Sequence, residues 1–308
     1  MRGLFVLYDY QLYGLKTKSE IALPEAYPVC INGLPDVTIR CGGISIDASS
    51  HPNSVHPTEK WWYYFLSNRH MIYTSGRATF EILDGRQIVV NQHIGDVDSD
   101  SRIQLLGTAF GVLQMQRGDI PMHGGTILYG GGAMVICGPV GAGKSTLISA
   151  MVEEGFSFLA DDVSTMSSAG ETIKIMPAYP QRKLKADACD SLGVNVGELE
   201  KMAEESMKYA VRDLDAWHSE PVELRCFVEV LKTKREHPEL QPLSGHEKLK
   251  ALMRNLYRYP FYRTTGIEPA LMKRLLEVAS KTDIYQLFRP DDHLTVKESV
   301  VLLKTIRY

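Results

Sequence analysis

The feature that most constrains this chain is the stretch G-P-V-G-A-G-K-S-T at residues 138–146, which fits the pattern G-x-x-x-x-G-K-[ST]. Gly141 and Gly143 can take backbone conformations that residues with a Cβ avoid, so successive N–H groups can point into one concavity. Lys144 brings a compact cation to the β- and γ-phosphates of a nucleotide, and the Ser145 hydroxyl can ligate Mg²⁺. The pattern therefore predicts a phosphate-binding loop.

The segments on either side supply the context that such a loop needs. Residues 133–137 form a short apolar run typical of a buried strand, and residues 144–154 have helical spacing before a stop at Gly155. The free N–H groups and the dipole of a helix N-terminus attract phosphate. A chance match in a glycine-rich turn would lack both flanks, so we interpret the stretch as a nucleotide site. Its predicted binding residues are Gly138, Val140, Gly141, Ala142, Gly143, Lys144, Ser145 and Thr146.

Two adjacent aspartates follow the next apolar segment. Residues 156–160 have the pattern of another buried strand, and Asp161 and Asp162 come directly after it. Carboxylates at the end of a strand beside a phosphate loop are typical metal ligands and catalytic bases, although paired aspartates also occur in solvated turns. Neighbouring side chains at a strand end point to different sides, so one can hold Mg²⁺ while the other accepts a proton. The residues alone predict a P-loop phosphotransferase.

The chain divides into two regions of different pattern. Residues 1–100 are rich in β-branched and aromatic residues, with a hairpin signal at Asp84 and Gly85, and the acidic residues 96–100 mark the expected boundary. In residues 101–308, apolar runs at 126–129 and 133–137 flank three glycines, which favours an antiparallel hairpin. The expected fold class is therefore α/β (α+β), with a C-terminal P-loop domain on a mixed sheet after an N-terminal β-rich domain.

The charge and the cysteines exclude some classes of partner and compartment. A net charge of −3 argues against binding nucleic acid through bulk electrostatics. The five cysteines are scattered, with no C-x-x-C pair, which favours reduced thiols over a disulfide frame or a zinc site. The apolar run within residues 1–9 is too short to predict a signal peptide, and no apolar run is long enough to predict a membrane span. We therefore expect a soluble cytoplasmic protein that binds neither nucleic acid nor membrane.

A histidine precedes the loop region, and a lone histidine is more often structural than catalytic. Here, however, M-H-G-G at residues 122–125 joins the loop at 138–146 and G-F-S-F-L-A-D-D at 155–162. This arrangement resembles the catalytic core of HPr serine kinase, which has these motifs in the same order and at similar spacing. The resemblance implies that Asp161 is the base toward a serine hydroxyl, that Asp162 and Ser145 serve Mg²⁺, and that His123 tunes the base. Lys144 completes the expected catalytic set.

The chain lacks the signature rich in Gly, Pro and Arg that follows the core of HPr kinase. Other segments, at residues 13–25, 105–107, 116–123 and 180–184, are similar to HPr-kinase-related proteins of lasso-peptide biosynthesis. Known members phosphorylate the C-terminal serine of a ribosomal precursor peptide. This resemblance implies a precursor-peptide substrate, ATP and Mg²⁺ as cofactors, and a homo-oligomer.

Positive side chains after the aspartates are candidates for gripping a phosphate or a terminal carboxylate. The candidates are Arg182, Lys183, Lys185, Lys208 and Arg212, and substrate contacts are expected above all from Arg182, Lys208 and Arg212. Arg182 is the first choice, because it follows a proline-bounded loop downstream of the aspartates. A solvated charged face is the alternative for each of them.

Three functional hypotheses remain open at the level of sequence. The first is an ATP- and Mg²⁺-dependent kinase that phosphorylates a serine of a peptide, in particular the C-terminal serine of a lasso-peptide precursor. The second is a kinase for free serine or another small hydroxyl metabolite. The third is a nucleotide-gated binding module in which hydrolysis is slow or absent.

Overall fold

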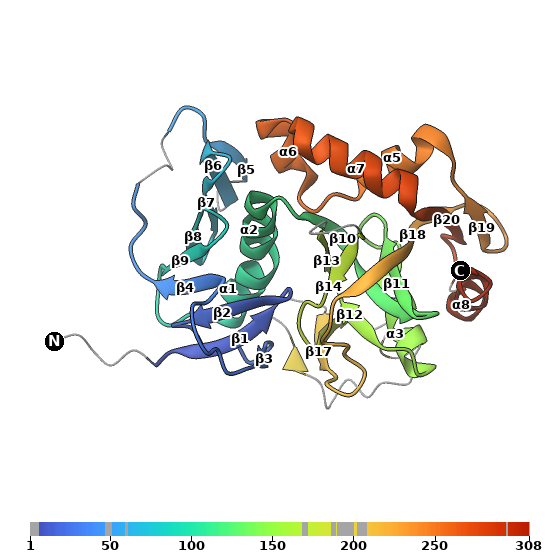
Figure 1. Ribbon diagram of the computed structural model, residues 1–308, viewed down its shortest axis with the longest axis horizontal. Helices are drawn as coiled ribbons and strands as arrows, with labels where there is room; N and C mark the ends of the chain where they lie inside the picture. The colour runs from blue at the N-terminus through green and yellow to red at the C-terminus, as the bar shows by residue number, and fades with distance from the viewer. Residues whose placement is uncertain are drawn as a thin grey trace. The chain divides into compact units, whose positions relative to one another are not determined.

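The structure is a computed structural model. It describes residues 6–46, 51–58, 61–167, 172–185, 189, 200–201, 208–293 and 295–307, with the backbone only at residues 185, 200, 201 and 208. The chain forms two compact units, Met1–Asp119 and Ile120–Tyr308. Each unit is described separately below (Figure 1).

The first unit is built on a nine-stranded sheet with the strand order β3-β1-β2-β4-β9-β8-β7-β6-β5. Its strands are β1 (Tyr8–Leu12), β2 (Leu15–Ser19), β3 (Tyr27–Pro28), β4 (Val37–Cys41), β5 (Val55–Thr58), β6 (Trp61–Ser67), β7 (His70–Ser75), β8 (Ala78–Leu83) and β9 (Gln87–Gln92). The expected hairpin is confirmed, since β8 and β9 are antiparallel around Asp84 and Gly85, whose φ angles are 54° and 64°. Two successive residues with positive φ are what a tight two-residue hairpin turn requires.

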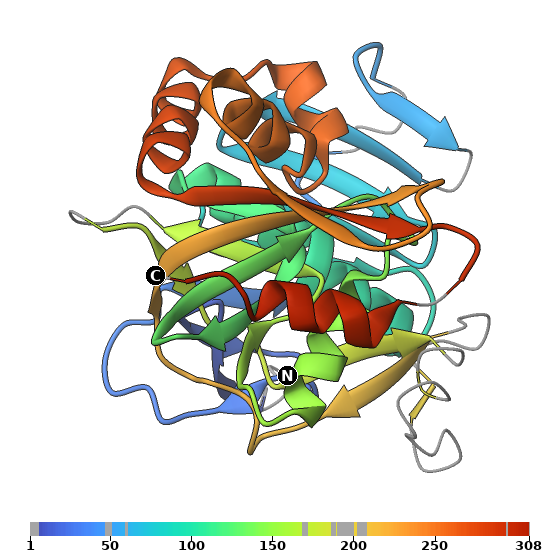
Figure 2. The same ribbon diagram turned by 90° about the vertical axis from the view of Figure 1, so that its right-hand side faces the viewer.

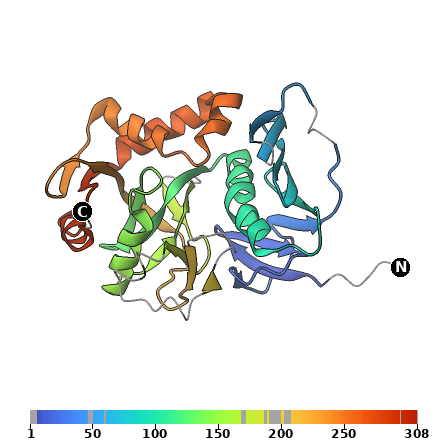
Figure 3. The same ribbon diagram turned by 180° about the vertical axis from the view of Figure 1, so that it is seen from behind.

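A helical segment also belongs to the first unit. It consists of α1 (Ser99–Gln104), η1 (Leu105–Ala109) and α2 (Phe110–Arg117), which run on from one another in Figure 3. Tyr73 Oη donates a hydrogen bond to Gln104 O at 2.9 Å, and Tyr13 Oη donates one to Leu106 O at 2.7 Å. These contacts tie the segment to β7 and to the turn between β1 and β2. The division of the chain therefore falls after Asp119, later than the boundary expected at residues 96–100.

The second unit contains the phosphate-loop motif and a mixed sheet. Its elements are β10 (Ile120–Tyr129), β11 (Gly132–Cys137), α3 (Lys144–Glu153), β12 (Phe158–Ala160), β13 (Val163–Ser167), β14 (Lys174–Met176), β15 (Gln181–Lys185), β16 (Glu200–Lys201), β17 (Lys208–Arg212), β18 (Val222–Thr233), β19 (Glu239–Pro242), α5 (Gly245–Arg254), α6 (Tyr259–Thr265), α7 (Pro269–Lys281), β20 (Asp283–Pro290) and α8 (Val296–Leu303). A small separate sheet has the order β15-β17-β16. The unit combines strands and helices on more than one sheet, which is consistent with the expected α/β (α+β) class.

The strand directions explain where a ligand would bind. Strand β11 is parallel to β18, and β18 is parallel to β20, whereas β10 runs antiparallel to β11 as the glycine hairpin predicts. The carboxyl ends of β11, β18 and β20 therefore meet at one edge. In sheets of this kind, ligands bind outside the carboxyl ends of the parallel strands.

Helix α3 is held by a hydrophobic core and by α8, which lies beside it in Figure 2. The residues that form this core include Ile136, Leu147, Ile148, Met151, Val228, Val300, Leu303 and Ile306. Lys304 Nζ also reaches Glu154 at 2.7 Å, just beyond the end of α3. The helix that follows the phosphate loop is thus anchored along its length. In the described part of the chain, no helix has both the length and the apolarity needed to cross a membrane.

Candidate active site

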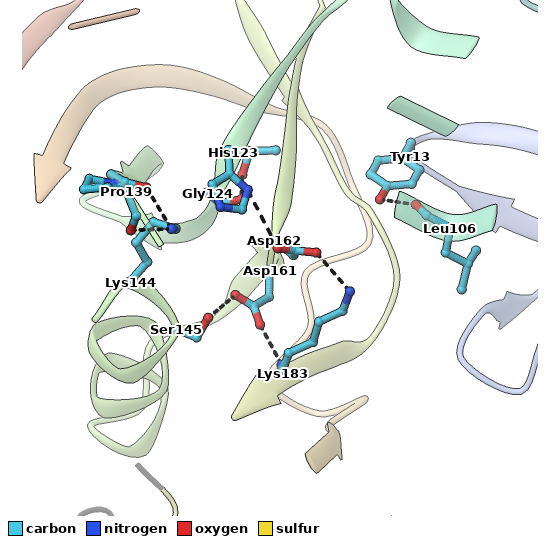
Figure 4. Close-up of polar contacts among 12 residues, drawn as sticks. Tyr13, Leu106, His123, Gly124, Pro139, Lys144, Ser145, Asp161, Asp162 and Lys183 are labelled. Atoms are coloured by element: carbon cyan, nitrogen blue, oxygen red, sulfur yellow. Dashed lines mark hydrogen bonds and ion pairs between the residues drawn. The ribbon is translucent and has the colours of Figure 1, made fainter. Parts of the chain in front are cut away.

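The glycine-rich loop occupies residues 138–143, between the end of β11 and the start of α3. Gly138 and Gly143 have φ angles of 143° and 91°, and a Cβ at Gly138 would clash with the carbonyl oxygen of Val230. Only glycine fits these positions without strain. Lys144, the first residue of α3, donates from Nζ to Gly138 O at 2.8 Å and to Pro139 O at 3.2 Å (Figure 4). Strand, loop and helix therefore follow one another as the sequence predicts.

The two glycines after His123 allow close packing beside the loop. Strand β10 pairs with β13 up to His123 and with β11 from Gly124 onward. A Cβ at Gly124 would clash with the Ile136 carbonyl oxygen, and a Cβ at Gly125 would clash with the Ile148 side chain. The glycines thus bring β10 against both β11 and α3, which places His123 at the edge of the loop.

Asp161 and Asp162 lie in the break between β12 and β13, two strands that both pair with β10. Asp162 has a φ angle of 75°, and its carbonyl oxygen accepts a hydrogen bond from Gly124 N at 3.1 Å. A positive φ is unfavourable for aspartate and is held here by the surrounding strands. The Asp161 carboxylate lies against Ser145 and the Asp162 carboxylate lies toward His123, while Lys183 contacts both of them (Figure 4).

The Asp161 carboxylate is buried against the start of α3. Its Oδ1 accepts a hydrogen bond from Ser145 Oγ at 3.1 Å, and its Oδ2 accepts one from Lys183 N at 2.6 Å. Burial raises the pKa of Asp161; the Lys183 hydrogen bond opposes this shift, and the charge of Asp162 adds to it. Both carboxylate oxygens are therefore engaged within the protein.

The Asp162 carboxylate is more accessible, with 26% of its side chain exposed. Lys183 Nζ donates to Asp162 Oδ2 at 3.0 Å, and His123 Nδ1 lies 3.8 Å from Asp162 Oδ1. The ring of His123 also packs against that of Tyr257, with 5.9 Å between the ring centres. Asp162 thus sits between a cation and an imidazole.

Two cavities meet at this aspartate. One of about 410 Å³ is lined by the loop residues 140–146, by Lys183 and by residues 289–293. The other, of about 660 Å³, is lined by residues 254–260 and by Glu229. His123, Val140 and Asp162 line both cavities, whereas Asp161 lines neither. Asp162 is therefore the carboxylate that a substrate in either cavity can reach.

The residues fit Mg²⁺, but through a different pair from the one expected. No group of three or more His, Cys, Asp or Glu side chains could hold a metal ion within the described ranges. Mg²⁺ at a phosphate loop needs fewer protein ligands, because phosphate oxygens and water complete its octahedron. Ser145 Oγ and Asp161 Oδ1, which are 3.1 Å apart, supply two hard oxygen ligands. The sequence analysis paired Ser145 with Asp162, which instead contacts His123 and Lys183.

Of the positive side chains expected to grip a substrate, Lys183 lines the first cavity, whereas Arg182 lines neither cavity. Arg182 is buried, with Nη1 2.7 Å from Ser149 Oγ and Nη2 3.3 Å from Asp213 Oδ2. This corrects the expectation for Arg182, whose contacts link β15 to α3. Arg212 is exposed on β17 and lines neither cavity, and the side chain of Lys208 lies outside the described residues.

A polar network around Glu229 was not anticipated from the sequence. Glu229 is buried on β18 and accepts hydrogen bonds from Arg254 Nη2 at 2.7 Å, Asn255 Nδ2 at 2.8 Å and Gln286 Nε2 at 2.8 Å. The backbone of Asn255 in turn accepts a hydrogen bond from His123 N at 2.8 Å. The network therefore fixes the backbone at His123. Its one signal in the sequence is a glutamate inside the apolar run 224–231.

Replacing Glu229 with glutamine is expected to lower the free energy of unfolding at pH 7 by about 1 to 3 kcal/mol, because Arg254 loses its anionic partner. Burial favours a raised pKa for Glu229, but the hydrogen bonds from Arg254, Gln286 and Asn255 outweigh it and lower the pKa. The stabilisation is therefore present above the unfolded-state pKa of about 4.3 and is lost as pH falls through the lower folded-state pKa.

The measurement is urea unfolding of wild type and variant at pH 7 and at pH 3.5 or below. The difference in the free energy of unfolding between wild type and Glu229→Gln should be smaller in acid than at pH 7. Glu223→Gln on the same strand is the matched control, because its pair with Arg225 is exposed and contributes less than about 1 kcal/mol. Equal losses in the two variants, or a gap that widens in acid, would contradict the assignment.

No protein-family model and no curated protein matches the chain. Among solved structures, the chain is similar to the HPr(Ser) kinase/phosphatase from Coxiella burnetii. The sequences are 13% identical, the similarity covers 60% of this chain and 91% of that chain, and the TM-score is 0.32. Likeness at this level carries no information on activity. Function is therefore inferred from the site itself.

Proposed function

We propose that the chain is an ATP- and Mg²⁺-dependent kinase that phosphorylates a serine hydroxyl of a peptide. The observation that carries the proposal is the position of Asp162. This partly exposed carboxylate lines both the cavity that holds most of the phosphate loop and a second cavity, which residues 254–260 line together with the first residues of the loop. A phosphotransferase needs such a group where its donor and its acceptor meet.

The first cavity would hold the nucleotide. The N–H groups at the start of α3 and the helix dipole favour a bound phosphate, and Lys144 adds a full charge. Ser145 and Asp161 would hold the Mg²⁺ ion, which neutralises phosphate charge when it is bound. ATP is the nucleotide proposed, because the sequence has no N-K-x-D motif for guanine.

The second cavity would hold the acceptor. Asp162 accepts the proton of the hydroxyl as the hydroxyl oxygen attacks the γ-phosphorus; the bond from that phosphorus to the β,γ-bridging oxygen breaks, and ADP leaves. Asp161 is less suited to this role, because it is buried and both of its oxygens already accept hydrogen bonds. His123 and Lys183 lie where they would tune the basicity of Asp162 and hold it in place. The proposal thus exchanges the roles that the HPr-kinase resemblance implies for the two aspartates.

The finer substrate assignment is the C-terminal serine of a lasso-peptide precursor. It is supported by the sequence resemblance. A cavity of about 660 Å³ is also large enough for a terminal residue and part of its neighbour. We retain the homo-oligomer as part of this proposal, on the resemblance alone.

The experiment that tests the proposal is mass spectrometry of acceptors incubated with the protein, ATP and Mg²⁺. The panel contains precursor peptides ending in serine, the same peptides ending in alanine, and free serine. One added phosphate on the terminal serine, and none on the alanine peptides, is the expected result. Phosphoserine from free serine alone would support the metabolite kinase. Nucleotide binding without any phosphorylated product would support the binding module.

A further inference from the structure

An arginine lies against the phosphate loop, and neither the motif nor the proposed reaction accounts for it. Arg289 is next to the last residue of β20, opposite Lys232 of the parallel strand β18. It therefore lies at the edge of the sheet where the phosphate loop begins. Its side chain lines the first cavity together with Lys144 and Ser145, yet the residue is only 4% exposed.

The contacts of Arg289 do not balance its charge. Nη1 donates a hydrogen bond to the backbone oxygen of Ala142 at 3.3 Å, and Nε is buried without a hydrogen-bond partner in the described residues. A Cβ at Gly143 would clash with Nη1, so the guanidinium group lies directly against the loop backbone. Burial lowers the pKa of Arg289, and the charge of Glu298 partly opposes the shift. An arginine nevertheless stays protonated in proteins.

The other buried arginine of this unit differs in one respect. The Nε atom of Arg182 also lacks a partner, but its Nη2 lies 3.3 Å from the Asp213 carboxylate. Among the residues that the structure describes, Arg289 forms no ion pair with a carboxylate, and the charge of Glu298 offsets its burial only in part. A buried charge without a counter-charge destabilises a folded protein, so such groups are normally paired. The partner of Arg289 is therefore to be sought among the ligands of its cavity.

We propose that Arg289 is a phosphate ligand of the nucleotide site: its guanidinium group pairs with a phosphate of a bound nucleoside polyphosphate. The planar guanidinium of arginine suits phosphate oxygens better than the ammonium group of lysine does. Arg289 would hold the phosphates from the β20 side of the loop, while Lys144 holds them from the α3 side. The inference rests on the proposed nucleotide site and adds a second cation to it.

The test compares Arg289→Met with wild type by calorimetric titration of ATP, ADP and pyrophosphate, and by thermal melting without ligand. Methionine fills part of the volume and removes the charge. The dissociation constants for ATP and ADP should rise by about 10- to 100-fold. The melting temperature without ligand should stay the same or rise, because an unpaired buried charge is lost. Weakened pyrophosphate binding would show that the contact is to phosphate and not to the base or ribose.

Two control variants show how the melting temperature and the affinity for ATP respond to the loss of an arginine outside the nucleotide site. Arg182→Met should lower the melting temperature, because Asp213 loses its partner, and should leave the affinity for ATP within a few-fold of wild type. Arg225→Met, at an exposed position on β18, should change neither quantity. If Arg289→Met behaves like Arg182→Met, with lower stability and unchanged affinity, Arg289 is a structural residue and the inference is overturned.

Two further outcomes separate the possible failures. Arg289→Lys, which keeps a charge, should bind ATP more tightly than Arg289→Met, and equal affinities would count against the proposal even if the methionine variant folded poorly. Wild type that binds neither ATP, ADP nor pyrophosphate would overturn the nucleotide site itself. Wild type that binds them as tightly as Arg289→Met does would overturn only the assignment of Arg289.

Discussion

Replacing Lys144 with alanine is expected to lower the rate of phosphate transfer by about 1,000-fold or more, because no other side chain at the start of α3 can neutralise charge on the transferred phosphate. The affinity for Mg·ATP should fall by about 10- to 100-fold, the effect of losing one charge-assisted contact. Lys144 Nζ is already held by the loop carbonyls of Gly138 and Pro139, so the charge is placed before the nucleotide binds.

The measurement is the rate of product formation at saturating acceptor, together with calorimetric titration of Mg·ATP. Lys304→Ala is the matched control, since this exposed lysine pairs with Glu154 near the other end of α3 and should change neither quantity. If the rate of phosphate transfer by Lys144→Ala stays within tenfold of the wild-type rate, residues 138–146 do not hold the reacting phosphate.

Replacing Asp162 with asparagine is expected to lower kcat by about 100- to 10,000-fold while the affinity for Mg·ATP stays within a few-fold of wild type. Asparagine keeps the size of the side chain and can still accept a hydrogen bond from Lys183, but it cannot take a proton from the acceptor hydroxyl. Rapid-quench kinetics at saturating ATP measure the chemical step directly.

Asp161→Asn should change the Mg²⁺ requirement of the reaction and not the proton transfer. Its carboxylate contacts Ser145 and not the cavities, so the variant should need a higher Mg²⁺ concentration for half-maximal rate. Asp283→Asn, at an exposed position on β20, controls for a general effect of charge. A large loss of kcat in Asp161→Asn at saturating Mg²⁺, with near-normal turnover in Asp162→Asn, would restore the assignment that the HPr-kinase resemblance implies.

Much of the local structure around the loop could be predicted from the sequence. The strand at residues 133–137, the helix that begins at Lys144 and the hairpin across Gly130 and Gly131 all depend on short-range patterns. Each is fixed by residues within a few positions of one another, through apolar spacing, glycine conformations and helix signals. Such features do not require knowledge of the tertiary fold.

The different contacts of the two aspartates could not be predicted in the same way. They depend on the positive φ angle of Asp162 and on the N–H group of Lys183, which comes from another strand. Arg182 and Lys183 illustrate the same limit, because neighbouring residues of a strand face opposite sides. Although the two residues are adjacent in β15, the Arg182 side chain contacts α3, whereas Lys183 contacts both aspartates.

Glu229 and Arg289 were missed because their positions near the phosphate loop depend on strand register. Glu229 lies beside Cys137, the last residue of β11, and Arg289 lies opposite Lys232. These pairings bring both side chains to the carboxyl ends of the parallel strands, although they are far from the loop in sequence. Hydrophobic periodicity reports the faces of a strand but not its partner.

The measurement that tests the account most directly is the fate of the γ-phosphate of labelled ATP, followed with Mg²⁺ and serine-containing peptides in wild type, Lys144→Ala and Asp162→Asn. We predict that wild type moves the label to a serine hydroxyl, that chelation of Mg²⁺ stops this, and that both variants are severely impaired. Label that stays on ATP, or is released only as inorganic phosphate with every acceptor, would contradict a kinase. Full transfer in Asp162→Asn would contradict the proposed base.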